Sequence, residues 1–137
     1  MKSEVNVKWN EKMSFECDID GHKIVIDALP ESGGEGKGPR PKPFMLLALA
    51  GCTGMDVISI LKKMRVEPDY FNIKIDAEAA EDHPKKYTDI TVIYQFKGKD
   101  LPMEKLEKAV SLSEEKYCGV SAVYRKAIKM NYKIEIL

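Results

Sequence analysis

Two cysteines of this sequence lie in surroundings that suit thiol chemistry. Cys52 lies near the middle of an almost wholly apolar run, PFMLLALAGCTGMDVISIL, between Gly51 and Gly54. Cys118 lies where one expected helix ends and the next begins, and a helix N-terminus lowers the pKa of a cysteine by favouring its thiolate. The two are 66 positions apart in sequence (118 − 52). If they meet in space, they form the pair that a dithiol needs to cycle through a disulfide.

The same small residues also permit a structural interpretation. The strip AGCTG, residues 50–54, lets another helix or strand come close, and Cys52 is then one of several small fillers. Composition alone favours this second interpretation. Both therefore stay open at the level of residue types.

The third cysteine, Cys17, is expected on the core side of a strand, where a free cysteine behaves as a small hydrophobe. The three cysteines lie far apart, without the C-x-x-C or Cys/His spacing of a local zinc motif. This spacing argues against a zinc site and against a disulfide-stapled secreted scaffold. In a reducing cytosol, a thiol that matters is usually catalytic or redox-sensing.

Composition indicates one compact domain, residues 1–137, with 44% hydrophobic residues. The 22 basic and 22 acidic residues balance, so nothing directs the chain toward nucleic acid or a lipid surface. The uncharged run 44–55 is shorter than the about 20 apolar residues that a membrane span needs. The first residues lack the apolar segment of a signal peptide. We expect a cytoplasmic protein with no nucleic-acid or membrane partner.

Alternating apolar and polar residues predict an N-terminal antiparallel meander. Its strands are expected at 4–10, 13–19 and 22–28, and Asp20-Gly21 is a good turn pair. A loop rich in glycine and proline follows at 29–43. A loop of this length is uncommon in a compact domain unless it is functional or disordered, and its glycines do not match a phosphate-binding motif.

The remainder predicts helices and strands in turn. Residues 43–65 form a helix with proline in its first turn, and it is apolar on nearly every side, which indicates burial all round. The later elements are strands at 71–79 and 88–96, a helix opened by Pro102 with one apolar side (Leu106, Ala109, Val110, Ser113, Tyr117), a short helix at 120–128 and a strand at 129–137. The predicted order is βββ–α–ββ–αα–β, an α+β domain built on antiparallel sheets around a long buried central helix.

Two motifs carry a family resemblance that covers essentially the whole chain. RPKPFMLLALAGCTGMDVISILKKMR, residues 40–65, resembles the cysteine-bearing helix of the OsmC/Ohr family of thiol peroxidases. SLSEEKYCGVSAV, residues 111–123, resembles the second cysteine motif of that family. The order of elements agrees as well. The resemblance is nearest to the short OsmC-like branch.

The resemblance implies a specific chemistry. Cys52 is implied as the peroxidatic cysteine, whose thiolate attacks a hydroperoxide and becomes a sulfenic acid. Cys118 is implied as the resolving cysteine, which condenses with it to a disulfide. A dithiol reductant, in this family typically lipoyl-linked, then restores both thiols. The resemblance further implies no flavin, haem or metal, and an intertwined homodimer with its sites at the subunit interface.

The residues that activate the thiolate in the family do not all carry over. The family glutamate lies two positions after the proline matched by Pro41, and that position is Pro43 here. The family arginine has one candidate, Arg40, with a shorter spacing to Cys52. Lys37 or Lys42 could replace its charge, without the fixed hydrogen-bonding fork of arginine. All three cations also fit an ordinary solvated loop.

Asp56 lies one helical turn after Cys52, on the same face of the expected helix. A nearby negative charge raises the pKa of a thiol unless a cation lies between them. Our hypothesis from the sequence is that Arg40 takes that place. Its expected acidic partner is Asp56, or alternatively Glu31 or Glu35.

The leading function from sequence is thus a hydroperoxide reductase. Apolar residues around Cys52 (Phe44, Leu47 and Met55) favour an organic hydroperoxide as substrate, although they also suit a plain core. The alternative is a non-catalytic dimer of the same fold that binds a small apolar ligand or acts as a thiol redox sensor. A purely structural dimer is a third interpretation.

Overall fold

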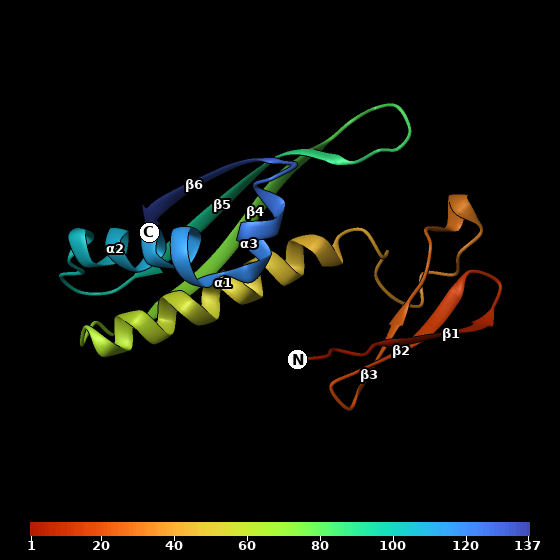
Figure 1. The fold of residues 1–137 in the computed structure, drawn as a ribbon, viewed down its shortest axis with the longest axis horizontal. Coiled ribbons are helices and arrows are strands. Elements are labelled where there is room, and N and C mark those ends of the chain that lie inside the picture. Colours follow the sequence, from red (N-terminus) through yellow and green to blue (C-terminus); the bar gives the residue numbers. More distant parts are fainter. The chain divides into compact units, whose positions relative to one another are not determined.

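The computed structural model describes residues 1–137, which divide into two compact units, Met1–Leu46 and Leu47–Leu137. The first unit contains a three-stranded sheet. The second contains another three-stranded sheet together with the helices (Figure 1). The mixed α+β class expected from the sequence is confirmed.

The first unit is the predicted meander. Strands β1 (Asn6–Glu11), β2 (Ser14–Ile19) and β3 (His22–Ile26) pair antiparallel in the order β1-β2-β3. The β2–β3 turn has positive φ at both Asp20 and Gly21, the geometry that fits the twist of a tight hairpin. Cys17 is buried, as predicted. Strand β1, at one edge of this sheet, is exposed along its whole length, whereas β3 at the other edge is partly buried.

The long segment after β3 is organised around one buried carboxylate. Asp27 accepts hydrogen bonds from the backbone N–H groups of Ala28 (2.7 Å), Glu35 (3.1 Å) and Lys37 (3.1 Å). A short 3₁₀ turn, η1 (Pro30–Ser32), lies within the segment. These contacts fold the glycine-rich stretch back on the end of β3.

The second unit packs its helices against one face of a mixed sheet (Figure 1). Strands β4 (Tyr70–Ala79) and β5 (Tyr87–Lys97) pair antiparallel, whereas β5 and β6 (Lys129–Ile136) run parallel. The antiparallel expectation is therefore wrong for β6. The chain between β5 and β6 passes through the helices α2 and α3 and so returns as a crossover, which is the connection that parallel strands require.

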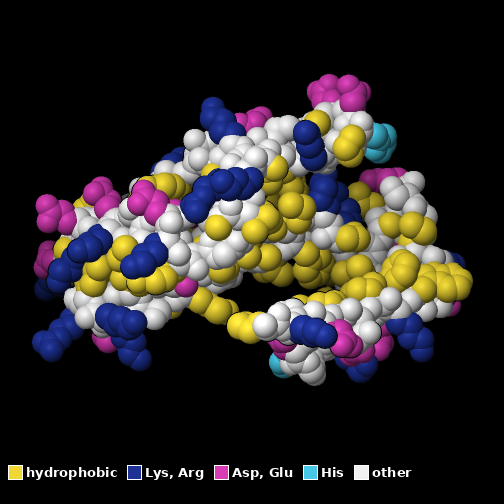
Figure 2. Space-filling view, viewed as in Figure 1, with side chains coloured by type: hydrophobic (Ala, Val, Ile, Leu, Met, Phe, Trp, Pro, Cys, Tyr) yellow, Lys and Arg dark blue, Asp and Glu magenta, His cyan; other side chains and the backbone are white.

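The long helix α1 (Phe44–Lys63) buries one stripe rather than its whole circumference. The buried residues recur every fourth position: Leu49, Thr53, Val57 and Leu61. The predicted burial all round is wrong for the single chain, since Leu47 is 62% exposed and Met55 74%. Figure 2 shows that hydrophobic side chains (yellow) are exposed on the surface of the molecule. By length and composition alone α1 could cross a membrane, a criterion that the core helix of a soluble protein also meets.

The segment that carries Cys118 differs from the prediction. Helix α2 (Met103–Leu112) passes into a single π-helical turn, η2 (Ser113–Tyr117), and α3 is short (Gly119–Tyr124). The predicted third helix at 120–128 thus ends four residues early. The π turn changes the rotation of the chain, so Tyr117, expected on the apolar side of the helix, is 54% exposed.

Candidate active site

The structure brings together three of the four residues predicted at the site. The sulfur atoms of Cys52 and Cys118 and a carboxylate oxygen of Asp56 all lie within 4.8 Å of one another. Both cysteines are free thiols. Cys52 and Asp56 lie one turn apart on α1, and Cys118 comes from the junction of η2 and α3. These three side chains, the Cys–Asp–Cys cluster, form the candidate site.

The π turn positions Cys118. The backbone N–H of Cys118 donates to the carbonyl of Ser113 over five residues (2.8 Å), as a π turn requires. Its sulfur accepts a hydrogen bond from the N–H of Ser121 (3.3 Å) and so caps α3. Cys118 is only 3% exposed, whereas Cys52 is partly open to solvent. The two sulfurs therefore differ in access.

Ser113 also fixes the acid of the cluster. Its hydroxyl donates to Oδ2 of Asp56 (3.0 Å), which joins the π turn to α1 across 57 positions of sequence. Asp56 is half-buried. The hydroxyl of Ser113 on η2 thereby orients the carboxylate of Asp56 on α1.

A buried polar network around Glu114 connects the π turn to its neighbouring elements. The carboxylate of Glu114 accepts hydrogen bonds from the hydroxyls of Tyr94 (2.6 Å) and Ser121 (3.2 Å). The guanidinium of Arg125 donates to the main-chain carbonyl of Glu114 (2.6 Å). A buried carboxylate needs such partners, because an unpaired one is costly. The network ties the cysteine-bearing segment to the central strand β5.

Sequence reasoning did not single out this network. Glu114 lies in a polar run, SEEKY, that reads as a solvated helix end. The π turn redirects Glu114 inward, where it is 8% exposed, and a helix of regular period gives no sign of that rotation. The Cys118-Gly119 break lies four residues after Glu114 (118 − 114) and does not mark it as buried.

The electrostatics of the cluster oppose a thiolate on Cys52. Burial raises the pKa of the Cys52 thiol, and the neighbouring Cys118 and the negative charge of Asp56 raise it further. The backbone N–H of Val120, which hydrogen-bonds to the sulfur, acts in the opposite direction and lowers this pKa. The sequence predicted that Asp56 raises the pKa of Cys52, and the charge of Asp56 acts in that direction here.

The predicted activating cations belong to the first unit. Arg40 is an exposed residue there, and its role at the cysteine stays a prediction. Lys37 is engaged in ion pairs with Glu11 (3.0 Å) and Glu35 (3.4 Å), and Lys12 also pairs with Glu35 (3.5 Å). Lysines therefore surround Glu35, one of the residues expected to hold Arg40.

The small residues beside Cys52 act unequally. A Cβ atom on Gly54 would lie 2.7 Å from Cδ1 of Ile73 on β4, so this glycine permits close approach of the helix to the strand. A Cβ on Gly51 would meet no atom within 4 Å. The structural interpretation of the AGCTG strip thus applies to Gly54 and not to Gly51 in this chain.

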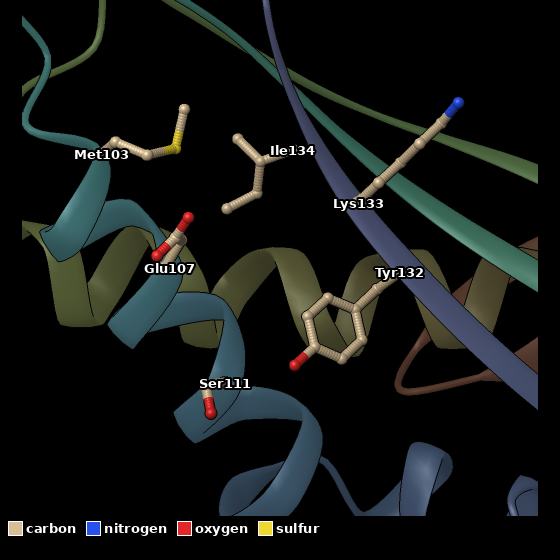
Figure 3. A pocket seen from close by; sticks show the side chains of 6 residues that line it. All are labelled: Met103, Glu107, Ser111, Tyr132, Lys133 and Ile134. Carbon is tan, nitrogen blue, oxygen red and sulfur yellow. The ribbon is translucent and has the colours of Figure 1, made fainter.

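The two hollows described next are not lined by any residue of the Cys–Asp–Cys cluster. A cavity of about 470 Å³ lies between α2 and β6, where Glu107 and Ser111 face Tyr132 and Ile134 while Lys133 points away (Figure 3). No cysteine lines it. An open apolar hollow of about 520 Å³ adjoins the helix turn of Cys52; its lining includes Gly51, Met55 and Phe71.

Comparison with known proteins places the fold and the family. The family model described as OsmC-like protein matches residues 34–133. Protein YhfA of Escherichia coli K12 is 34% identical over 135 residues, which cover 98% of each chain. The structure of a hypothetical protein from Aquifex aeolicus VF5 is similar with a TM-score of 0.88 at 31% identity, covering 100% of this chain and 97% of that one.

A more distant likeness concerns the fold alone. The organic hydroperoxide resistance protein OhrB of Bacillus subtilis superposes with a TM-score of 0.68 at 18% identity, covering 98% of both chains. The family match spans well over half of the sequence and includes both cysteines of the cluster. This chain belongs to the OsmC-like protein family.

Proposed function

We propose that this protein is a cysteine-based hydroperoxide reductase that cycles through a Cys52–Cys118 disulfide. One observation carries the proposal: two sulfurs 66 positions apart in sequence (118 − 52) lie within 4.8 Å as free thiols. A modest local movement brings such a pair to the S–S bond length of about 2.05 Å. Membership of the OsmC-like family adds support.

The difference in access assigns the two sulfurs their order. The accessible Cys52 thiolate attacks the O–O bond of the hydroperoxide, forms an S–O bond, and releases the alcohol after protonation of the leaving oxygen. The buried thiol of Cys118 then attacks the sulfur of the sulfenic acid, forms the disulfide and releases water. A dithiol reductant supplies two electrons and two protons that restore both thiols.

The raised pKa of Cys52 limits the first step. At neutral pH the thiol form dominates, and only the thiolate attacks the peroxide. A cation beside the sulfur reverses this effect, and Arg40 is our proposed source of it. The position of the family glutamate is occupied by Pro43, whose side chain has no acceptor. We therefore expect slow turnover unless Arg40 reaches the thiol.

A second copy of the chain is part of the proposal. Helix α1 leaves large apolar side chains open to solvent: Leu47, Met55 and Ile58. Contiguous exposed apolar surface of this kind is typical of protein interfaces. We propose a cytoplasmic homodimer in which the partner subunit covers this face.

The experiment is a thiol count after one equivalent of tert-butyl hydroperoxide is added to reduced protein. A reductase loses two thiols per chain as a Cys52–Cys118 disulfide, identified by peptide mass. Cys17→Ser retains this reaction, and Cys52→Ser abolishes peroxide consumption. Two thiols that persist in the wild type, or a disulfide that involves Cys17, overturn the proposal.

A matched pair of variants examines activation. Arg40→Ala slows the first step if Arg40 stabilises the thiolate, whereas Lys62→Ala, an exposed cation on α1, leaves the rate unchanged. Equal rates for the wild type and Arg40→Ala remove Arg40 from the mechanism.

One observation favours the alternative function. The Cys52 thiol has a raised pKa beside an open apolar hollow of about 520 Å³, as suits a ligand-binding member with an unreactive cysteine. Such a protein keeps its thiols in the peroxide experiment and gains thermal stability with a small apolar compound.

A further inference from the structure

The three side chains of the Cys–Asp–Cys cluster are a metal-ligand set. Two thiolates and one carboxylate are ligands that Zn²⁺ accepts, and three protein ligands with an open fourth position is the composition of many reactive zinc sites. Their ligand atoms lie within 4.8 Å of one another. No local sequence motif signals the set, because the cysteines come from separate elements.

The distances fit closure around one ion. A Zn–S bond is about 2.3 Å long, so two sulfurs on a tetrahedral zinc lie roughly 3.8 Å apart. The cluster is within about 1 Å of that arrangement. Cys52 and Asp56 are spaced i, i+4 on α1, a spacing that places two ligands on one face of a helix, as in other zinc-binding helices.

Hydrogen bonds already orient the donors. Ser113 donates to Oδ2 of Asp56 at 3.0 Å, which leaves the other carboxylate oxygen available. The N–H of Ser121 donates to the sulfur of Cys118 at 3.3 Å, which orients the second ligand. Partners of this kind fix metal ligands and influence affinity.

The charges of the cluster favour a cation. Asp56 brings a carboxylate into this half-buried space, and each thiolate formed on Cys52 or Cys118 would place a further negative charge within 4.8 Å of it. A divalent cation between the three groups removes that repulsion and is itself stabilised by them.

We propose that the reduced protein binds one Zn²⁺ through Cys52, Asp56 and Cys118, with water at the fourth position on the solvent side of Cys52. The proposal does not depend on peroxidase activity, since it requires only the reduced pair and the acid. Metal binding and disulfide formation exclude each other, because both use the same two sulfurs. Bound zinc therefore protects the pair from oxidation.

The test uses the reduced full-length protein, stripped of metal and kept under anaerobic conditions. Titration with Co²⁺ gives thiolate-to-cobalt charge transfer and the visible bands of tetrahedral cobalt at one equivalent per chain. Zn²⁺ then displaces the cobalt, and competition with a chromogenic chelator yields the zinc affinity. No thiolate band, or a band without saturation at one equivalent, overturns the proposal.

Variants assign the ligands. Cys52→Ser, which alters an accessible position on α1, loses the cobalt spectrum, and Cys17→Ser retains it. Asp56→Asn weakens zinc binding at least about tenfold, and Ser113→Ala weakens it by about 10-fold, the lower end of the range for loss of an outer partner. Asp69→Asn, an exposed control, leaves the affinity unchanged. An unchanged affinity in Asp56→Asn overturns the three-ligand site.

The two proposals fail separately. A protein that loses two thiols to peroxide but gives no cobalt spectrum refutes the zinc site alone. A protein that binds zinc, but whose metal-free form keeps its thiols when peroxide is added, refutes the reductase alone. With both properties present, one equivalent of Zn²⁺ slows thiol loss at least tenfold, and equal rates with and without zinc overturn binding through both sulfurs.

Discussion

The hydroxyl of Tyr94 donates a 2.6 Å hydrogen bond to the carboxylate of Glu114, joining the central strand β5 to the π turn that carries Cys118. Tyr94 has no exposed surface, and Glu114 is almost completely buried. Burial, and then the charge of Glu114, raise the pKa of the Tyr94 phenol above its ordinary range, so it remains a proton donor. The segment that presents Cys118 is held by this contact.

Tyr94→Phe is expected to destabilise the protein by about 1–3 kcal/mol, because it removes one donor from a buried carboxylate. The free energy of unfolding from urea titration measures the loss. Tyr117→Phe, at an exposed position on the same π turn, is the matched control and changes stability little. Equal stability of the Tyr94 variant and the wild type would show that Glu114 does not need this donor.

Asp56→Asn is expected to lower the pKa of the Cys52 thiol, because the negative charge of Asp56 raises it. At a pH below this pKa, more thiolate is then present and alkylation of Cys52 by iodoacetamide becomes a few-fold faster. Rates measured across pH, with the labelled peptide identified by mass, give the pKa directly. Asp82→Asn, an exposed turn variant, leaves the profile unchanged. Slower alkylation or a higher pKa in Asp56→Asn contradicts the electrostatic account.

Asp27→Asn is expected to reduce thermal stability at neutral pH and to lose this effect in acid. Backbone hydrogen bonds from Lys37 and Ala28 lower the pKa of Asp27 below its ordinary value. The stabilisation is thus present above the unfolded-state pKa of about 3.9 and is lost as pH falls through the lower folded-state pKa.

The difference in Tm between wild type and Asp27→Asn therefore narrows from pH 7 to acid. Glu31→Gln, exposed in the same segment, is the control and keeps a small, constant difference. A gap that widens in acid contradicts the assigned direction of the pKa shift.

Met55→Glu is expected to convert the proposed homodimer to monomer, since the side chain is 74% exposed on the apolar face of α1. Burying a new carboxylate without a partner in an interface is unfavourable. Light scattering coupled to size exclusion gives the mass of each species. Lys108→Glu, an exposed charge change on α2, retains the mass of the wild type. A wild-type chain of monomer mass removes the dimer from the proposed function.

The sequence by itself determined most of the elements, because their signals are local, although it did not predict the π turn. Alternation located the strands of both sheets and placed Cys17 in a core, and the apolar run located α1. The family motifs further named Cys52 and Cys118 as a pair. The sequence did not determine the direction of β6 or the exposed face of α1, because these depend on how elements pack rather than on their own periodicity.

Only the tertiary structure decided the chemistry of the site. Ser113 reaches Asp56 where the π turn begins, and within this turn Glu114 points inward to Tyr94. These contacts join residues up to 57 positions apart, and they exist only once the helices pack on the sheet. The same packing gathers two sulfurs and a carboxylate into one half-buried space, where proximity and burial, which no spacing along the chain encodes, set the pKa of Cys52.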